Sequence, residues 1–95
     1  MTEYKYNKRD DYEPEFYDLC RAYHIPWIQL NRGQGADNIL LGRFLQIVEV
    51  KNGRNYHLTA EEEKQKAIVE DAGGEYWVVY DTDTSIAAIK AARGE

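Results

Sequence analysis

The chain has 95 residues, 12 Lys and Arg against 17 Asp and Glu, and a formal net charge of −5. This length fits one small domain, and the single Cys and two His exclude a disulfide framework and leave few ligands for a structural zinc site. No stretch approaches the roughly 18 apolar residues of a membrane span, and the charged start lacks the apolar segment of a signal peptide. We therefore expect a cytoplasmic protein with no membrane partner.

The chain begins with polar residues and continues into a first helix. Residues 1–12 are charged and aromatic without periodicity, so we expect an arm there and a single folded domain over 13–95. The helix is expected to begin at Asp11 or Glu13 and to end before Pro26, because a proline forces the preceding residue out of the helical region. Its apolar residues recur at helical spacing and are expected to face the core: Phe16, Leu19, Cys20 and Tyr23.

Three strands are expected in the middle of the chain. Residues 27–30 form a short apolar run, and two further runs over 39–41 and 44–51 flank Gly42 and Arg43. Two apolar runs around a Gly-x pair predict a β-hairpin with a two-residue turn.

A helix, a strand and a last helix are expected to follow. Thr59 with Glu62 three residues later is the pattern of a capping box, and a Gly-Gly pair ends that helix. The continuous apolar run 76–80 predicts a central strand covered on both faces, and Asp83 or Thr84 is the expected cap of the last helix. This order predicts a mixed α/β layer fold. We expect two residues in the core, Trp27 and Trp77, and two on the surface, His24 and His57.

The basic residues are concentrated in the middle of this acidic chain. Residues 32–54 carry four Lys and Arg but only two acids, Asp37 and Glu49, and are the one segment of net positive charge. The acidic balance of the whole chain therefore does not exclude contact with nucleic acid through this segment.

An acid-x-Lys triplet occurs three times in the chain, but one of the three is hard to explain as solvated surface. The three are Glu3-Tyr4-Lys5, Glu49-Val50-Lys51 and Glu62-Glu63-Lys64. The first lies in the polar arm and the third on a charged helix, so we expect both in solvent. The middle triplet ends an apolar strand, where residues two apart point to the same face.

Asp37 is expected to lie near Glu49 across the hairpin. A two-residue turn places Asp37 opposite Val48, whereas a three-residue turn or a bulge places it opposite Glu49, and such cross-strand neighbours have Cβ atoms about 5 Å apart. Two carboxylates at that distance repel one another unless a cation lies between them. Oxygen ligands, with the Val50 carbonyl completing the set, suit Mg²⁺ or Mn²⁺.

Such a site serves phosphodiester hydrolysis. The metal lowers the pKa of a bound water and neutralises charge on the phosphate, while Lys51 orients or helps to deprotonate that water and stabilises the developing charge. An alternative stays open from the residues alone: Glu49 and Lys51 form a structural ion pair at a strand end, and Asp37 caps a turn.

The motifs together resemble a known nuclease family. Gly35-Ala36-Asp37, an apolar hairpin and Glu49-Val50-Lys51 resemble the PD-(D/E)XK nuclease core, and within it the chain is most similar to the VRR-NUC (virus-type replication-repair nuclease) domain. Residues 9–15, 33–37 and 58–62 resemble the family's opening helix motif, its Gly-x-Pro-Asp step and the start of its post-strand helix. The resemblance implies a restriction-endonuclease-like α-β-β-β-α-β core in which helices flank a mixed sheet.

The resemblance also implies the residues of the site. Asp37, Glu49 and the Val50 carbonyl correspond to metal ligands, Lys51 to the catalytic lysine, and Glu13 to a further acid from the first helix. Mg²⁺ is the implied cofactor, with Mn²⁺ substituting for it and no organic cofactor.

Three features of this chain differ from the family pattern or leave it ambiguous. Ala36 replaces the usual proline, which shapes the backbone and supplies no ligand. Asn38 stands where an apolar residue is usual, so the strand is expected to start one residue late. The polar helper early in the second helix is either Glu62 or Gln65.

The implied activity is that of a Mg²⁺-dependent, structure-selective endonuclease that hydrolyses phosphodiester bonds in branched DNA. Such proteins resemble Holliday-junction resolvases, act as homodimers and belong to bacterial or phage-infected cells. The tyrosines of the arm would pack across the dimer interface, or the arm is a frayed terminus. The alternative function is a catalytically silent nuclease-like fold that binds DNA or a replication protein. Loop residues around the site are expected to contact DNA: Arg32, Gln34, Arg43 and Arg54.

Overall fold

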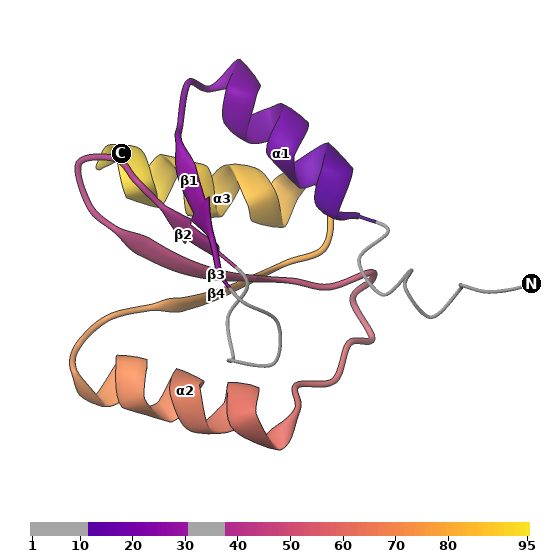
Figure 1. Cartoon of the computed structure of the whole chain (residues 1–95), viewed down its shortest axis with the longest axis vertical. Coiled ribbons are helices and arrows are strands. Elements are labelled where there is room, and N and C mark those ends of the chain that lie inside the picture. Colours follow the sequence, from indigo (N-terminus) through magenta and orange to yellow (C-terminus); the bar gives the residue numbers. More distant parts are fainter. Residues whose placement is uncertain (1–11, 31–37) are drawn as a thin grey trace, which may run out of the picture.

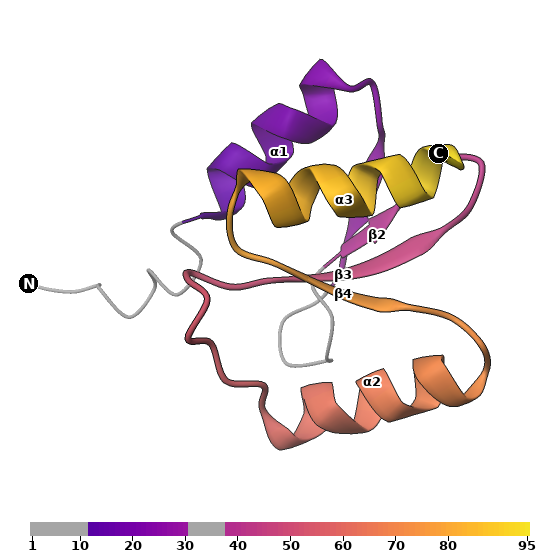
Figure 2. The same cartoon turned by 180° about the vertical axis from the view of Figure 1, so that it is seen from behind.

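Helices cover both faces of a four-stranded sheet in the computed structural model, which describes residues 12–30 and 38–95 (Figure 1). Two helices, α1 (Glu13–Ala22) and α3 (Thr82–Arg93), lie on one face, and α2 (Ala60–Asp71) lies on the other, as the view from behind also shows (Figure 2). The order of elements along the chain is the predicted one, and an α/β fold with a mixed sheet between helices is confirmed. The strands are β1 (Trp27–Gln29), β2 (Asn38–Leu40), β3 (Gln46–Val50) and β4 (Tyr76–Val79).

The sheet has the strand order β1-β2-β3-β4, with antiparallel pairs β1–β2 and β2–β3 and a parallel pair β3–β4. The prediction that 76–80 forms a central strand is wrong, because β4 lies at an edge of this sheet. The apolar run has another cause: α3 and α2 both contact β4, from opposite faces of the sheet (Figure 1). A continuous apolar run therefore reports cover on both faces and not the position of a strand within the sheet.

The connection between β2 and β3 is longer than predicted. Residues 41–45 separate the two strands, and Asn38 pairs with Val48, which is the register of the longer-turn alternative. The two-residue turn is wrong because this segment reaches the end of α3, where the Phe44 N–H donates a hydrogen bond of 3.0 Å to the Ala92 carbonyl.

Gly42 makes this contact between the connection and α3 possible. A Cβ at this position would lie 2.4 Å from the carbonyl oxygen of Ala92, a separation that no side chain can occupy. The glycine is therefore required for close backbone approach and not for the conformation of a tight turn.

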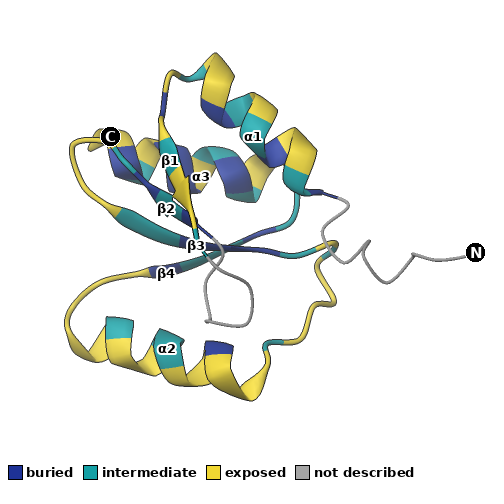
Figure 3. Ribbon diagram, viewed as in Figure 1, coloured by how far each residue is buried: buried dark blue, intermediate teal, exposed yellow. Residues whose placement is uncertain are grey.

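The core lies between the sheet and the layer formed by α1 and α3 (Figure 3). Phe16, Cys20 and Ile89 are inaccessible to solvent there, and burial raises the pKa of the Cys20 thiol to about 12. The prediction that Cys20 is a core residue is confirmed. Two residues pack half-buried against this core, Trp27 and Trp77, and two others are exposed as predicted, His24 and His57.

Capping boxes begin α2 and α3. The predicted box of Thr59 and Glu62 is confirmed. The cap of α3 is Asp81 and not Asp83 or Thr84. The Asp81 Oδ1 accepts a hydrogen bond of 2.9 Å from the Thr84 N–H, and the Thr84 Oγ1 accepts one of 3.2 Å from the Asp81 N–H. The two members of the box are three residues apart, which is the spacing this motif requires. None of the helices in the described ranges is long and apolar enough to cross a membrane.

Candidate functional site

Three polar residues meet where β3 ends against the start of α2, and we call them the Glu49–Lys51–Glu62 cluster. Glu49 is 1% exposed, although it is charged at neutral pH in ordinary surroundings. The Lys51 Nζ lies 3.7 Å from the Glu49 Oε2 and 3.0 Å from the Glu62 Oε1. The prediction that Glu49 and Lys51 share a face is confirmed, and Glu62 of α2 is the third member.

The capping box of α2 fixes Glu62 in this position. The Glu62 N–H donates to the Thr59 Oγ1 over 3.1 Å, and the Thr59 N–H donates to the Glu62 Oε1 over 2.9 Å. The same carboxylate oxygen accepts the hydrogen bond from Lys51. A helix-starting motif therefore also positions the lysine, because one oxygen serves both contacts.

Hydrogen bonding keeps the Glu62 carboxyl in its charged form. Burial of Glu62 raises its pKa, but the Thr59 N–H, the Lys51 amine and a hydrogen bond with Glu49 lower it by more, so its pKa lies below the ordinary value. At neutral pH the lysine consequently faces a carboxylate on α2 as well as the buried acid of β3.

The described acid-x-Lys triplets differ in how far their lysines are buried. Lys64 of the third triplet is 71% exposed and lies 3.8 Å from Glu61, as expected for a charged helix surface, whereas Lys51 is 19% exposed. The expectation that Glu62 is solvated is wrong, because the capping box turns its side chain back toward Lys51. Of the two candidates for the polar helper, Glu62 contacts Lys51, and Gln65 lies half-buried one turn further along α2. The first triplet, over 3–5, lies outside the described residues.

Glu13 is linked to the start of β2 through a tyrosine. The Tyr17 hydroxyl lies 2.8 Å from the Glu13 Oε2 and 3.0 Å from the Asn38 Oδ1. Asn38 is fully buried and is the first residue of β2, so the expectation that this strand starts one residue late is wrong. The tyrosine gives the buried Asn38 Oδ1 a hydrogen-bond partner, whereas the buried Asn38 Nδ2 has none among the described residues.

The relation of Glu13 to the candidate metal ligands is indirect. Glu13, the acid that the resemblance implies, is half-buried, whereas Glu15 is exposed. Its tyrosine-mediated contact reaches Asn38, which pairs with Val48, the neighbour of Glu49 on β3. Asp37, which precedes Asn38, lies outside the described residues.

The segment that follows β3 lines an open pocket beside the cluster. Residues 51–57 surround a volume of about 470 Å³, with Lys51 at one end of the segment. Two hydrogen bonds hold this segment in place: the Lys51 N–H donates to the Val79 carbonyl over 2.9 Å, and the Tyr12 N–H donates to the Asn52 side-chain Oδ1 over 3.3 Å. The pocket is therefore attached both to β4 and to the start of α1.

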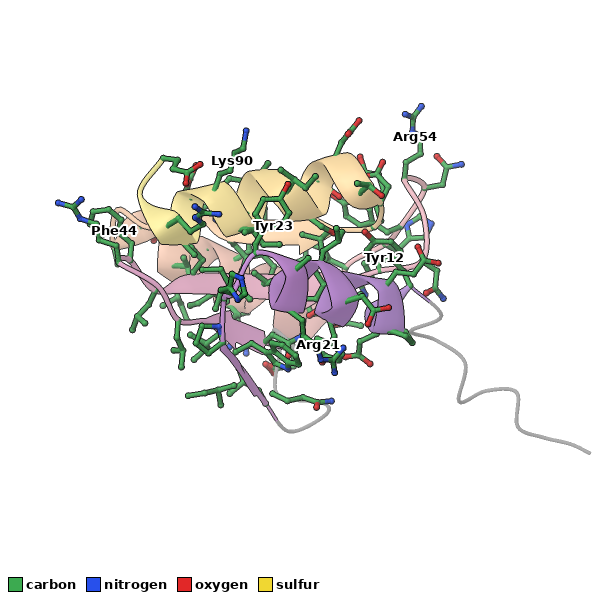
Figure 4. All side chains as sticks on the ribbon, turned by 90° about the horizontal axis from the view of Figure 1, so that it is seen from above. Tyr12, Arg21, Tyr23, Phe44, Arg54 and Lys90 are labelled. Carbon is green, nitrogen blue, oxygen red and sulfur yellow. The ribbon has the colours of Figure 1, made fainter. Side chains whose placement is uncertain are left out.

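The loop residues that were expected to contact DNA do not share one region of the protein. Arg54 lines the pocket beside Lys51. The expectation that Arg43 lies near the site is wrong: it packs 5.7 Å from the Phe44 ring centroid, and Figure 4 shows Phe44 and Arg54 at opposite ends of the molecule. Arg43 belongs to the connection that reaches the end of α3, at the opposite end of β3 from Lys51. Arg32 and Gln34 lie outside the described residues.

The donors of the candidate metal site are hard oxygen atoms. In the described ranges no group of three His, Cys, Asp or Glu side chains is arranged to hold a metal ion, and Asp37 is outside those ranges. The described part of the proposed ligand set, the Glu49 carboxylate and the Val50 carbonyl, has the chemistry that Mg²⁺ prefers. The cluster holds two carboxyl groups beside one lysine, and a hydrogen bond joins the two carboxyl groups, so a proton or a cation would lower the repulsion between them. The described oxygen donors, one carboxylate and one carbonyl, are of the type that binds a divalent cation.

Two residues near the site were not singled out from the sequence. Tyr17 follows Glu13 by four residues, and this i, i+4 spacing is the signal that could have indicated their contact. Tyr56 lines the pocket and carries no motif, so its position depends on how the 51–57 segment folds.

The chain was compared with known proteins in three ways. No protein-family model matches it, and no curated protein and no solved structure matches it.

Proposed function

We propose that this chain is a metal-dependent endonuclease that hydrolyses phosphodiester bonds in branched DNA. One observation carries the proposal: Glu49 is almost completely buried at the end of an apolar strand, and the Lys51 amine lies 3.7 Å from it and 3.0 Å from a second carboxylate. Burying a charged acid beside a lysine costs desolvation energy that a surface ion pair avoids. A buried acid and a lysine that are kept together despite this cost are candidates for catalytic residues.

The arrangement of the elements supports the same proposal. The α-β-β-β-α-β order and the mixed sheet are what a restriction-endonuclease-like core requires, and the acid-x-Lys pair lies at the end of the third strand. These features agree with the resemblance to the PD-(D/E)XK nucleases and, within them, to the VRR-NUC domain.

In this proposal the residues of the cluster manage the charge of the reaction. Glu49, Asp37 and the Val50 carbonyl would hold Mg²⁺, or Mn²⁺ in its place, and the chemistry such an ion supplies is neutralisation of phosphate charge and activation of water. Lys51 orients the attacking water and stabilises the charge that develops as water adds to phosphorus and one P–O ester bond breaks. Glu62 holds the lysine in place, and Glu13 is a further acid of the site.

A second copy of the chain is part of the proposal. A four-way junction is resolved by two symmetric cuts, and a two-fold dimer presents two identical sites. A short chain also gains buried surface by pairing with a copy of itself.

A second candidate is a catalytically silent fold that binds DNA or a replication protein. The contact between Lys51 and Glu62 favours it, because the same ion pair would attach α2 to the sheet in a protein without catalytic activity. The two candidates differ in whether Lys51 is needed for strand cleavage.

Cleavage of a matched panel of DNA substrates tests the proposal. The panel contains a four-way junction, a flap, a splayed arm and a plain duplex, each incubated with Mg²⁺ or Mn²⁺. We expect the wild type to cut the branched substrates, Lys51→Ala to lose at least about a hundred-fold of the rate, and Lys64→Ala, which removes an exposed lysine, to cut like the wild type. No cleavage by the wild type would contradict the enzyme. Equal cleavage of all four substrates would contradict its selectivity.

Metal binding tests the ligand set separately from cleavage. In calorimetric titrations with Mn²⁺ we expect the wild type to bind and both Glu49→Gln and Asp37→Ala to bind at least about ten-fold more weakly, because each loses a charged oxygen ligand. Glu61→Gln removes an exposed acid of α2 and should bind like the wild type. A wild type that binds no Mn²⁺ would exclude the proposed metal site.

A further inference from the structure

The pocket beside the cluster is lined by basic, amide and aromatic side chains, and most of its lining surface is apolar. Lys51, Arg54 and His57 are among its lining residues, and Asn52 and Asn55 add amides. None of the described residues that line it is an acid, although the charge of Arg54 also acts on Asp81. A pocket of this composition suits a ligand that carries negative charge and hydrogen-bonding groups, as a nucleotide does.

Tyr56 gives the pocket an aromatic surface. Its side chain is exposed to 38%, and its ring lies 5.9 Å from the Tyr80 ring at an interplanar angle of 37°. Tyr80 therefore supports the ring from within the protein while part of it stays accessible to a ligand. An accessible aromatic ring beside cations is the arrangement on which proteins stack single-stranded bases.

The segment that carries these groups is held at both ends. Lys51 is bonded to β4 through its N–H, and the capping box fixes the chain again at Thr59, where α2 begins. Asn52 receives a further hydrogen bond from the start of α1. A ligand in the pocket would accordingly lie at a fixed position relative to the Lys51 amine, because Lys51 belongs to the cluster and to the pocket lining.

We infer that this pocket binds an unpaired nucleotide next to the scissile phosphate, with its base stacked on Tyr56 and a neighbouring phosphate contacted by Arg54. This inference rests on the proposed function and names the substrate class: DNA with an unstacked nucleotide at the cleavage position. In a duplex the faces of the bases are covered by their neighbours, whereas at a branch point or in a flap they are accessible. The pocket is then the part of the chain that favours branched over plain DNA.

Binding of single-stranded oligonucleotides tests the inference without cleavage. A fluorescein-labelled oligothymidylate and an abasic oligonucleotide of equal length are titrated in EDTA, and affinity is read from fluorescence anisotropy. We expect wild type to bind oligothymidylate about ten-fold more tightly than the abasic strand, Tyr56→Ala to lose this preference, and Tyr56→Phe to keep it. Arg54→Ala should weaken binding to both strands alike, and Arg43→Ala, which changes an arginine at the other end of the sheet, should affect binding less.

The outcomes separate the inference from the proposed function. Equal affinity of the wild type for the two strands, or no binding to either, would overturn the inference without the use of any variant. A preference that survives Tyr56→Ala in a protein with an unchanged circular dichroism spectrum would also overturn it. If the wild type shows the base-dependent binding but cuts nothing in the substrate panel, the nucleotide-binding inference is supported and the proposed endonuclease activity is contradicted. If it cuts branched DNA but binds the two oligonucleotides equally, the endonuclease activity is supported and the nucleotide-binding inference is contradicted.

Discussion

Replacing Glu62 by glutamine removes one charge from the cluster and preserves the shape of the side chain. The Glu62 side chain is 11% exposed, and its Oε1 accepts hydrogen bonds from the Lys51 amine over 3.0 Å and from the Thr59 N–H over 2.9 Å. An amide oxygen can still accept from the Thr59 N–H. The variant therefore keeps the capping box and weakens the interaction with Lys51.

The structure gives a magnitude for this change. Opposite unit charges 3.0 Å apart attract by about 5 to 6 kcal/mol at an effective dielectric constant near 20. Desolvation of the two groups and the ordering of the lysine offset most of that, and a hydrogen bond to a charged group contributes about 1.5 to 3 kcal/mol net. Since the amide retains a neutral hydrogen bond, we expect Glu62→Gln to lower the free energy of unfolding by about 1.5 kcal/mol.

The loss of stability should depend on pH with a defined sign. The pKa of Glu62 is lower in the folded than in the unfolded protein, so its charged form stabilises the fold above the unfolded pKa of about 4.3. That contribution disappears as the pH falls through the lower, folded pKa. The difference between the wild type and Glu62→Gln should be full near neutral pH and should shrink steadily below about pH 4.

Urea denaturation followed by circular dichroism measures this difference at neutral pH and again below about pH 4. Glu63→Gln is the matched control, because it removes the same charge from the same helical turn at an exposed position. We expect the control to lose no more than about 0.5 kcal/mol, from the helix dipole alone. Equal stability of the two variants at neutral pH would refute the contribution of the Lys51–Glu62 contact. A difference that does not fall with pH would refute its ionic origin.

Three further predictions concern the rest of the fold. Gly42→Ala should lower the free energy of unfolding by at least about 2 kcal/mol in urea titrations, because its Cβ would meet the Ala92 carbonyl, whereas Gly53→Ala has nothing within 4 Å and should lie within about 0.5 kcal/mol of the wild type. His24→Gly should raise the melting temperature by about 3 to 6 °C in thermal scans, since His24 adopts a left-handed backbone conformation (φ 59°) after the end of α1 that glycine occupies without strain; an unchanged or lower value would contradict this. The Cys20 thiol, buried and with a pKa of about 12, should react with a thiol reagent near pH 8 only after denaturant is added, and rapid reaction of the native protein would contradict its burial.

Local patterns in the sequence predicted most of the elements, because each depends on residues close together in the chain. The helix of Thr59 and Glu62 and the core position of Cys20 follow from spacings of three and four residues. The two-residue turn failed because its competitor is distant: residues 41–45 bond to the end of α3, which lies about half the chain away. The prediction that 76–80 is a central strand was wrong for the same reason. An edge strand that is covered by helices on both faces has the same apolar sequence as a central strand, so the run does not show how many strands pair with it.

In the candidate site, too, contacts within one segment could be predicted from the sequence, whereas contacts between segments could not. Strand alternation was enough to place Glu49 and Lys51 on one face, because both residues belong to one segment. The choice of Glu62 over Gln65 as the partner of Lys51 required the position of the start of α2 relative to the end of β3, which the capping-box pattern alone does not contain. The prediction that Arg43 lies near the site was wrong together with the two-residue turn, because residues 41–45 instead reach the end of α3.

One oxygen atom connects the stability of α2 to the chemistry of the proposed site. Glu62 is the one buried residue of α2, whose Ile68 remains 65% exposed, so few apolar side chains of this helix are buried against the sheet. The contact with Lys51 is therefore one of the main attachments of α2 to the sheet. In a nuclease the same contact restricts the lysine that faces the phosphate, so Glu62→Gln should slow cleavage by about ten-fold while Mn²⁺ affinity stays unchanged. Parallel loss of cleavage and metal binding would instead assign Glu62 to the metal site.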